Sequence, residues 1–309
     1  MPGPQPARRD GSRVFEADPA ADKLRRQGSH IQLLRCIARL MAVCSLLAPA
    51  VRGEAESPTP AALAAFDRYV VAAESRLAHQ HSSPDGFLVG AASASSQDSR
   101  LRGGERIVEQ IAPANETSTP GAMLHHWRAT GFVSGATAAG FVRLMKDVSD
   151  YPKRFAPEVV RATVSAPANA GNGDHINASM RVRQKHVITV VMDTDYDIVF
   201  GSLDPKHGYS ISRSTSISEI AAAGTPGEHR LSAAEEHGFL WRQNIYWSFE
   251  ERDGGLYLQV ESISLTRAIP TGLGWALKPF VESVPRESLE FTLRCVSDAL
   301  RAKPEQAAR

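Results

Sequence analysis

The sequence predicts an α+β domain in which antiparallel strands precede a long C-terminal helix. Strand-length runs rich in β-branched residues follow one another from 158 to 220 with no helical pattern between them. Parallel pairing would need a crossover of about a dozen residues or more between strands, so the runs favour an antiparallel sheet. Apolar residues then alternate along 239–249, and they recur at helical spacing from 289 to 300.

Composition argues for a globular chain without a strong electric field. The chain has 309 residues, of which 42% are hydrophobic, and its 35 Lys and Arg are balanced by 34 Asp and Glu. A protein that binds nucleic acid through its charge is usually basic. The balance therefore argues against a nucleic-acid partner.

The first 53 residues are predicted to be a leader with a secretory signal. Basic residues, among them Arg35 and Arg39, precede the apolar run 40–51. The run is shorter than the roughly 20 residues that span a bilayer, so cleavage is expected and an uncleaved membrane anchor is the alternative. Either way, the sequence predicts export to a periplasmic or extracellular location. Cys295 is the one cysteine outside this segment, which precludes an intrachain disulfide in the mature chain, and we expect its thiol to be buried and inert.

Residues 54–122 are predicted to form an N-terminal helix and loop extension. Apolar residues three or four positions apart between 63 and 77 indicate one amphipathic helix, which we expect to pack on the main domain. A Ser-, Ala- and Gly-rich loop is expected over 81–99, and a short strand over 104–111. The stripe consists of Leu63, Phe66, Val70, Ala73 and Leu77.

From 123 onwards the pattern is strand, helix, strands and a closing helix. A strand is predicted over 124–133, and a helix over 135–151 that ends before Pro152. The following strands are predicted over 158–165, 175–184, 185–192, 196–203 and 209–220.

Four acids in and beside the fourth of these runs have the spacing of a calcium loop. An EF-hand loop requires glycine at its sixth position, where this chain has Ile198. The sequence therefore predicts a solvated hairpin turn and no bound calcium or other metal. The acids are Asp193, Asp195, Asp197 and Asp204.

A hairpin over 239–264 is the clearest single signal. The dipeptide Asp253-Gly254 is a preferred two-residue turn, and it would place Phe249 beside Leu258 and Trp247 beside Val260. One face of the first strand would then be aromatic and the other polar. The expected aromatic face holds Phe239, Trp241, Ile245, Trp247 and Phe249, and the polar face holds Arg242, Asn244, Ser248 and Glu250.

The last helix is predicted to start at Pro285, because proline is favoured in a first helical turn. The expected apolar stripe is Leu289, Leu293, Val296 and Leu300. Residues 304–309 are expected to be a disordered tail.

This order of elements resembles the START-like superfamily, which includes Bet v 1, coenzyme Q-binding proteins and polyketide cyclases. The resemblance spans 124–302 and is carried by "GATAAGFVRLMKDVSDYPKRFAPEVVRATV", the uninterrupted strands, and the closing "LYLQVESISL" and "LEFTLRCVSDALR". It implies a helix-grip fold, in which a curved sheet wraps around the C-terminal helix and leaves an apolar cavity. The expected ligand is a small apolar molecule such as a lipid, an isoprenoid or an aromatic metabolite, with no cofactor.

The resemblance also suggests which residues meet that ligand. The expected wall is Trp241, Ile245, Trp247, Phe249, Leu258 and Val260, and the expected gate, on a Gly- and Pro-rich segment over the mouth, is Trp275, Leu277 and Phe280. Trp275 and Phe280 could instead plug the core. Arg242, Asn244, Tyr246 and Arg267 could anchor a polar head group or form a solvated face.

Two further functions are left open by the sequence. A cyclase- or dehydratase-like enzyme would need an acid or base in the cavity, and His126 and Tyr246 are the first candidates. His125 and His126 are neighbours on a strand and point to opposite faces, so they cannot share one metal ion. A protein-interaction module with a filled core is the other alternative, and transient membrane contact is compatible with any of these functions.

Overall fold

The computed structural model describes residues 57–83, 87–89, 96–112, 119, 121–165, 174–185, 188–269 and 274–302, with the side chains of 274–282 excepted. Residues Glu54–Arg309 form one compact unit. The predicted leader and the C-terminal tail both lie outside the described residues. Among those described, no helix is both long enough and apolar enough to cross a membrane.

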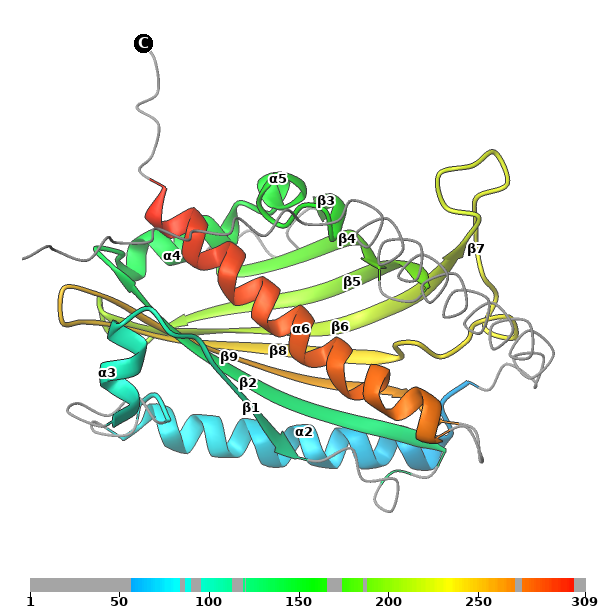
Figure 1. Ribbon diagram of the computed structural model, residues 1–309, viewed down its shortest axis with the longest axis horizontal. Helices are drawn as coiled ribbons and strands as arrows, with labels where there is room; N and C mark the ends of the chain where they lie inside the picture. Colours follow the sequence, from blue (N-terminus) through cyan, green and yellow to red (C-terminus); the bar gives the residue numbers. More distant parts are fainter. Residues whose placement is uncertain are drawn as a thin grey trace, which may run out of the picture. The chain divides into compact units, whose positions relative to one another are not determined.

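An open antiparallel sheet forms the centre of this unit (Figure 1). It has nine strands within the described residues, in the order β1-β2-β9-β8-β6-β5-β4-β3, and β7 pairs with β6 off this path. The early strands are β1 (Ile107–Ala112), β2 (Ala122–Ser134), β3 (Val159–Ser165), β4 (His175–Lys185) and β5 (Thr189–Ser202). The later strands are β6 (His207–Ala221), β7 (His229–Arg230), β8 (Arg242–Arg252) and β9 (Gly255–Arg267).

Strand β5 corrects one prediction. The two runs predicted over 185–192 and 196–203 form a single strand, so the acids from Asp193 to Asp197 do not lie in a turn. They face β4 instead, where Asp193 accepts hydrogen bonds from Arg181 at 2.7 and 2.9 Å, and Asp195 accepts one from Ser179 at 2.6 Å. Cross-strand pairs of this kind stabilise acids within a strand. Only Asp204 lies in the predicted hairpin turn, where its carboxylate caps the backbone N–H groups of Lys206 and His207.

The helices also differ in part from the prediction. The helix expected to end before Pro152 ends at Lys146, and Pro152 lies in the first turn of the next helix, where a missing N–H costs nothing. Four residues of the predicted loop, 96–99, belong to a short helix. The helices are α2 (Pro60–His81), α3 (Ser96–Arg102), α4 (Ala138–Lys146), the 3₁₀ turn η2 (Val148–Asp150), α5 (Tyr151–Arg154) and α6 (Gly274–Arg301).

The start of the C-terminal helix is a further correction. Helix α6 begins at Gly274, so Pro285 lies inside the helix. The part of the Gly- and Pro-rich segment from Gly274 onwards is therefore helical as well. Glycine and proline lower helix propensity, which is why the pattern placed the start too late. The predicted gate residues Trp275, Leu277 and Phe280 lie on this helix, with side chains outside those described.

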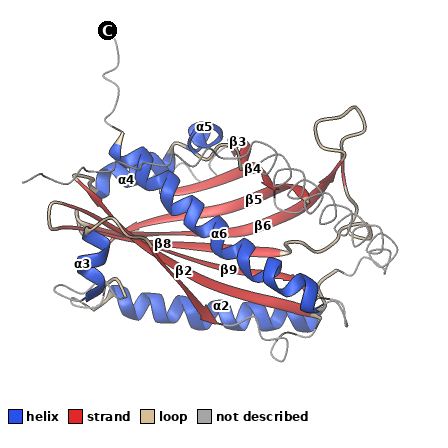
Figure 2. Ribbon diagram, in the orientation of Figure 1, coloured by secondary structure: helices blue, strands red, loops and turns tan. Residues whose placement is uncertain are grey.

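Two helices cover opposite faces of the sheet (Figure 2). Leu289, Leu293 and Val296 of α6 pack on one face, where Gly131 of β2 lets the helix approach closely. Helix α2 packs on the other face against residues such as Ile263 and Leu265 of β9. With both faces covered, β2 and β9 are buried along almost their whole length. The fold is α+β and helix-grip-like, as predicted.

Candidate functional site

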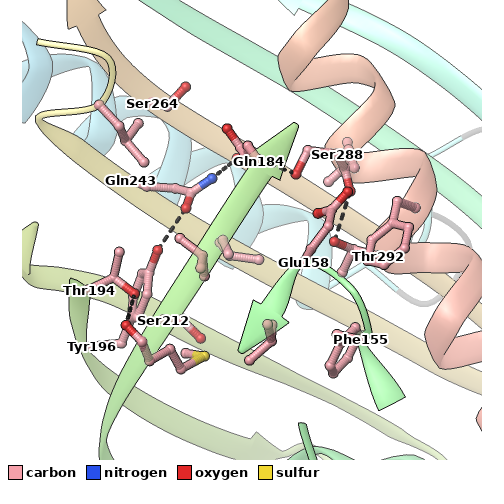
Figure 3. A pocket seen from close by; sticks show the side chains of 18 of the residues that line it. Phe155, Glu158, Gln184, Thr194, Tyr196, Ser212, Gln243, Ser264, Ser288 and Thr292 are labelled. Carbon is pink, nitrogen blue, oxygen red and sulfur yellow. Dashed lines mark hydrogen bonds between the residues drawn. The ribbon is translucent and has the colours of Figure 1, made fainter. Parts of the chain in front are cut away.

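A cavity of about 210 Å³ lies between α6 and the sheet (Figure 3). Strands β4, β5, β6, β8 and β9 supply one side and α6 the other, and the segment from α4 to the start of β3 closes one edge. A concave space with a mostly apolar lining and a few polar groups is typical of small-molecule sites. We therefore take this cavity as the candidate site.

The predicted hairpin supplies the apolar wall. The turn has positive φ at Asp253 (56°) and Gly254 (73°), as a type I′ turn requires, and the register pairs Trp247 with Val260 and Phe249 with Leu258, as predicted. Ile245, Trp247 and Val260 line the cavity. The other apolar lining residues include Phe155, Ile198 and Leu289.

The remaining predicted wall residues lie elsewhere. Phe249 and Leu258 are on the cavity face but nearer the turn, where they pack in the core beside Phe141 of α4. Trp241 packs in the α2-side cluster with Leu265. It precedes the first residue of β8, so strict alternation does not extend to it, and the prediction that it shares a face with Trp247 is wrong. Phe239 borders the cavity and is 41% exposed.

A hydrogen-bonded group on one side of the cavity is satisfied within the protein. The Tyr196 hydroxyl donates to Gln243 Oε1 at 2.7 Å, and Gln243 Nε2 donates to Ser262 Oγ at 3.4 Å. Burial raises the pKa of Tyr196 above its ordinary value, so this phenol stays protonated and continues to donate. Ser264 continues the polar stripe along β9. This group can orient a ligand, but its strongest donors and acceptors are already paired.

A second polar group lies on the other side, and the sequence had not indicated it. Glu158, Ser288 and Thr292 lie together in Figure 3, with Gln184 near them. Burial raises the pKa of Glu158 from 4.5 to about 7, although the positive charge of Arg294 acts in the opposite direction. No local motif marks Glu158, because its place in the lining depends on where α6 crosses the edge of the sheet.

The two residues proposed as catalytic candidates face away from the cavity. His126 contacts Tyr69 of α2 through Nδ1 at 2.9 Å, and Tyr246 lies in the α2-side cluster, where its hydroxyl donates to Glu74 at 3.1 Å. Side chains alternate between the two faces of a strand, so each of these residues points away from the tryptophan that follows it. Trp127 and Trp247 face the core beneath α6. The enzyme hypothesis therefore loses both of its candidates as groups within the cavity.

His125, the neighbour of His126, points to the cavity side of β2. Its Nε2 lies 3.1 Å from the hydroxyl of the cavity-lining Thr266, and its Nδ1 has no hydrogen-bond partner in the described structure. Burial lowers the pKa of His125 from 6.5 to about 4, which keeps the imidazole neutral near pH 7. His125, and not the predicted candidate His126, therefore lies behind the cavity wall.

A buried ionic cluster holds α2 on the opposite face. Glu261 is 1% exposed, and its Oε2 lies 2.9 Å from His126 Nε2 and pairs with Arg76 of α2. Burial alone would raise the pKa of Glu261, but the hydrogen bond from His126 and the charge of Arg76 outweigh it and hold the pKa below its ordinary value. A carboxylate must accept, so His126 donates through Nε2 and accepts from Tyr69 at Nδ1 when its imidazole is neutral.

The polar face predicted for β8 is therefore not solvated throughout. Asn244 is 5% exposed and donates to the Tyr246 hydroxyl at 3.0 Å. Helix α2 covers this part of the sheet, and its Glu74 pairs with Arg213 of β6. Arg242 is half-buried and donates to the carbonyl of Trp241. No group of His, Cys, Asp and Glu suited to a metal ion occurs in the part of the chain that the structure describes.

Comparison with known proteins gives matches only among solved structures. No family profile and no curated protein matches the chain. It is similar to a START superfamily protein from Mycobacterium smegmatis, with 15% identity over 57% of this chain and 97% of that one and a TM-score of 0.38. It is also similar to human STARD10, with 9% identity over 64% of this chain and 74% of that one and a TM-score of 0.41.

A STAR-related lipid transfer protein from Xanthomonas axonopodis is a third match. It has 13% identity over 63% of this chain and 98% of that one, with a TM-score of 0.38. With identities and TM-scores this low, these matches carry no argument about ligand or activity.

Proposed function

We propose that this protein binds a small, largely apolar molecule in the cavity between α6 and the sheet. The observation that carries the proposal is the lining itself, in which Trp247, Ile245 and Val260 of one hairpin face Leu289 of α6 across about 210 Å³. Each Å² of apolar ligand surface removed from water there would contribute about 25 cal/mol to binding. The polar groups around the wall would set the orientation of the ligand.

A first experiment asks whether the protein carries such a molecule. The full-length chain, purified from the cells that make it, would be analysed by native mass spectrometry and then extracted with solvent. We expect a stoichiometric apolar adduct, or an empty protein that takes up 1-octanol in calorimetry. A protein that is empty and also fails to bind 1-octanol or any of a panel of lipids and aromatics would overturn the proposal and favour a protein-interaction role.

The two tryptophans at either end of 241–247 provide a matched pair of variants. Trp247 lines the cavity and Trp241 packs on the α2 side, and they are 2% and 6% exposed. Trp247→Ala should weaken 1-octanol binding by roughly tenfold, a loss of about 1.4 kcal/mol, whereas Trp241→Ala should leave the affinity of the folded protein unchanged.

Both alanine variants remove a buried aromatic side chain and are expected to lower stability, so their folding is checked by circular dichroism before titration. Ile245→Trp gives a second test, because it fills the cavity instead of enlarging it and should abolish binding. Equal affinity in the wild type, Trp247→Ala and Ile245→Trp would show that the ligand binds elsewhere.

We also propose that the chain works outside the cytoplasm. The support is the basic segment with Arg35 and Arg39 followed by the apolar run 40–51. Cell fractionation followed by N-terminal sequencing would test this. A shortened chain in the exported fraction or an intact chain in the membrane fraction would support export, as a cleaved or an anchored protein, and an intact chain confined to the cytoplasm would exclude it.

A further inference from the structure

The two polar groups in the cavity differ in what they leave for a ligand. In the first group, Gln243 uses its amide oxygen to accept from Tyr196 and its amide nitrogen to donate to Ser262. Its backbone N–H donates to Ser214 Oγ at 2.9 Å. This side of the cavity is internally paired and makes little demand on a ligand.

In the second group, half of the donors are already used. Gln184 Nε2 donates to Ser288 Oγ at 3.5 Å, and the Thr292 hydroxyl donates to the carbonyl of Ser288 at 2.8 Å. What remains is the second N–H and the carbonyl oxygen of Gln184, the lone pairs of Thr292, the hydroxyl hydrogen of Ser288 and the carboxyl group of Glu158. This side of the cavity therefore presents mainly acceptors.

Glu158 is the group that most needs a partner. It lies in the turn just before the edge strand β3, half-buried beside α6, and no hydrogen bond or ion pair to its carboxylate is found among the described residues. The charged and titratable groups of α6 that act on it are Arg294 and Cys295. Arg294 is exposed, with its guanidinium 5.3 Å from the ring centre of Phe291, so water screens its charge.

A carboxylate in this position lacks the counter-ion that usually accompanies a buried charge. The acids on the α2 side show the contrast, because Glu261 has Arg76 and His126, and Glu74 has Arg213. A ligand with an ammonium group would supply both the missing charge and several hydrogen-bond donors. An alcohol would supply a donor alone, and a ligand carboxylate would add a second negative charge.

We propose that the cavity selects a lipophilic amine, with the apolar body against Trp247 and the ammonium group against Glu158, Thr292 and Gln184. This inference rests on the proposed function, because it names the head group of the molecule that the cavity would hold. Among ligands with the same apolar body, Glu158 would favour the one whose head group is an ammonium.

Three eight-carbon probes separate the head group from the body. Calorimetry would compare 1-octylamine, 1-octanol and octanoate at pH 6 and pH 8. With Glu158 titrating near pH 7, its ionised fraction rises about tenfold between these pH values, and so should the affinity for octylamine, which stays protonated throughout. The affinity for octanol should change little, and octanoate should bind weakest at pH 8.

The variant Glu158→Gln keeps the shape of the side chain and removes its charge. It should abolish the pH dependence of octylamine binding and lower the affinity about tenfold at pH 8, with octanol binding unchanged. Glu290→Gln makes the same change on α6 outside the cavity lining, and it should leave both affinities as in the wild type.

The outcomes distinguish this inference from the proposed function. If octanol and octylamine bind equally at pH 8 and Glu158→Gln alters neither, the head-group assignment fails while the apolar cavity stands. Octanoate binding most tightly would also overturn it. If none of the three probes binds, and the purified protein is also empty and binds none of the lipids and aromatics of the panel, the proposed function itself fails.

Discussion

The two faces of the sheet are both buried but are built differently. On the α2 face, buried charges have partners, as Glu261 has in His126 and Arg76. On the α6 face, the carboxylate of Glu158 lies beside the cavity and has no such partner among the described residues. Buried charge is expensive unless it is paired. The pairing of its acids fits a structural contact on the α2 face, whereas the unpaired Glu158 fits the proposed ligand on the α6 face.

The largest expected effect comes from breaking the ionic cluster on the α2 face. Glu261→Gln removes the buried carboxylate that Arg76 shares with Arg128, whose side chain is only 11% exposed, so we expect a loss of about 3 kcal/mol in the free energy of unfolding, measured by urea denaturation. The control is Glu109→Gln on β1, which removes a more exposed partner of Arg128 and should cost about 0.5 kcal/mol or less. Similar losses in the two variants would mean that the cluster contributes no more than a surface pair.

The next effect concerns His125 behind the cavity wall. Its pKa is lowered from 6.5 to about 4, so the unfolded chain takes up a proton at higher pH than the folded one. Its contribution is therefore present above pH 6.5 and is lost as pH falls towards 4, by up to about 3 kcal/mol. His125→Gln should remove this part of the acid dependence in denaturation curves from pH 7 to pH 4. An unchanged slope would show that the imidazole is not desolvated as the structure indicates.

The smallest effect is expected from Glu158 in the absence of ligand. Because its pKa is raised from 4.5 to about 7, ionisation opposes folding, and the stability of the wild type should decline as pH rises from 4.5 to 7. Because Glu158 is only half-buried and water screens its charge, Glu158→Gln should match the wild type at pH 4 and melt only on the order of 2 °C higher at pH 8. A variant that melts lower at pH 8 would indicate that Glu158 has a stabilising partner, and would weaken the contrast between the two faces.

Local patterns in the sequence determined much of the fold. The Asp253-Gly254 turn set the register that places Trp247 opposite Val260. A two-residue turn fixes which residues pair across the hairpin, and the alternation of side chains along a strand fixes the face on which each lies. The helical stripe from Leu289 to Val296 correctly predicted the face of α6 that packs on the sheet. The stripe in α2 was likewise correct for Phe66, Val70, Ala73 and Leu77, which are buried.

What only the tertiary structure decided is how these elements meet. Periodicity says which face of an element is apolar, but not which partner covers it. The docking of α2 buried a face of the sheet that was expected to be solvated. His126 and Tyr246 lie on that face and contact α2, so they do not line the cavity. The crossing of α6 placed Glu158 beside Ser288 and Thr292, residues 130 or more positions away in the chain. Contacts between segments so far apart depend on the whole packing, and no local pattern encodes them.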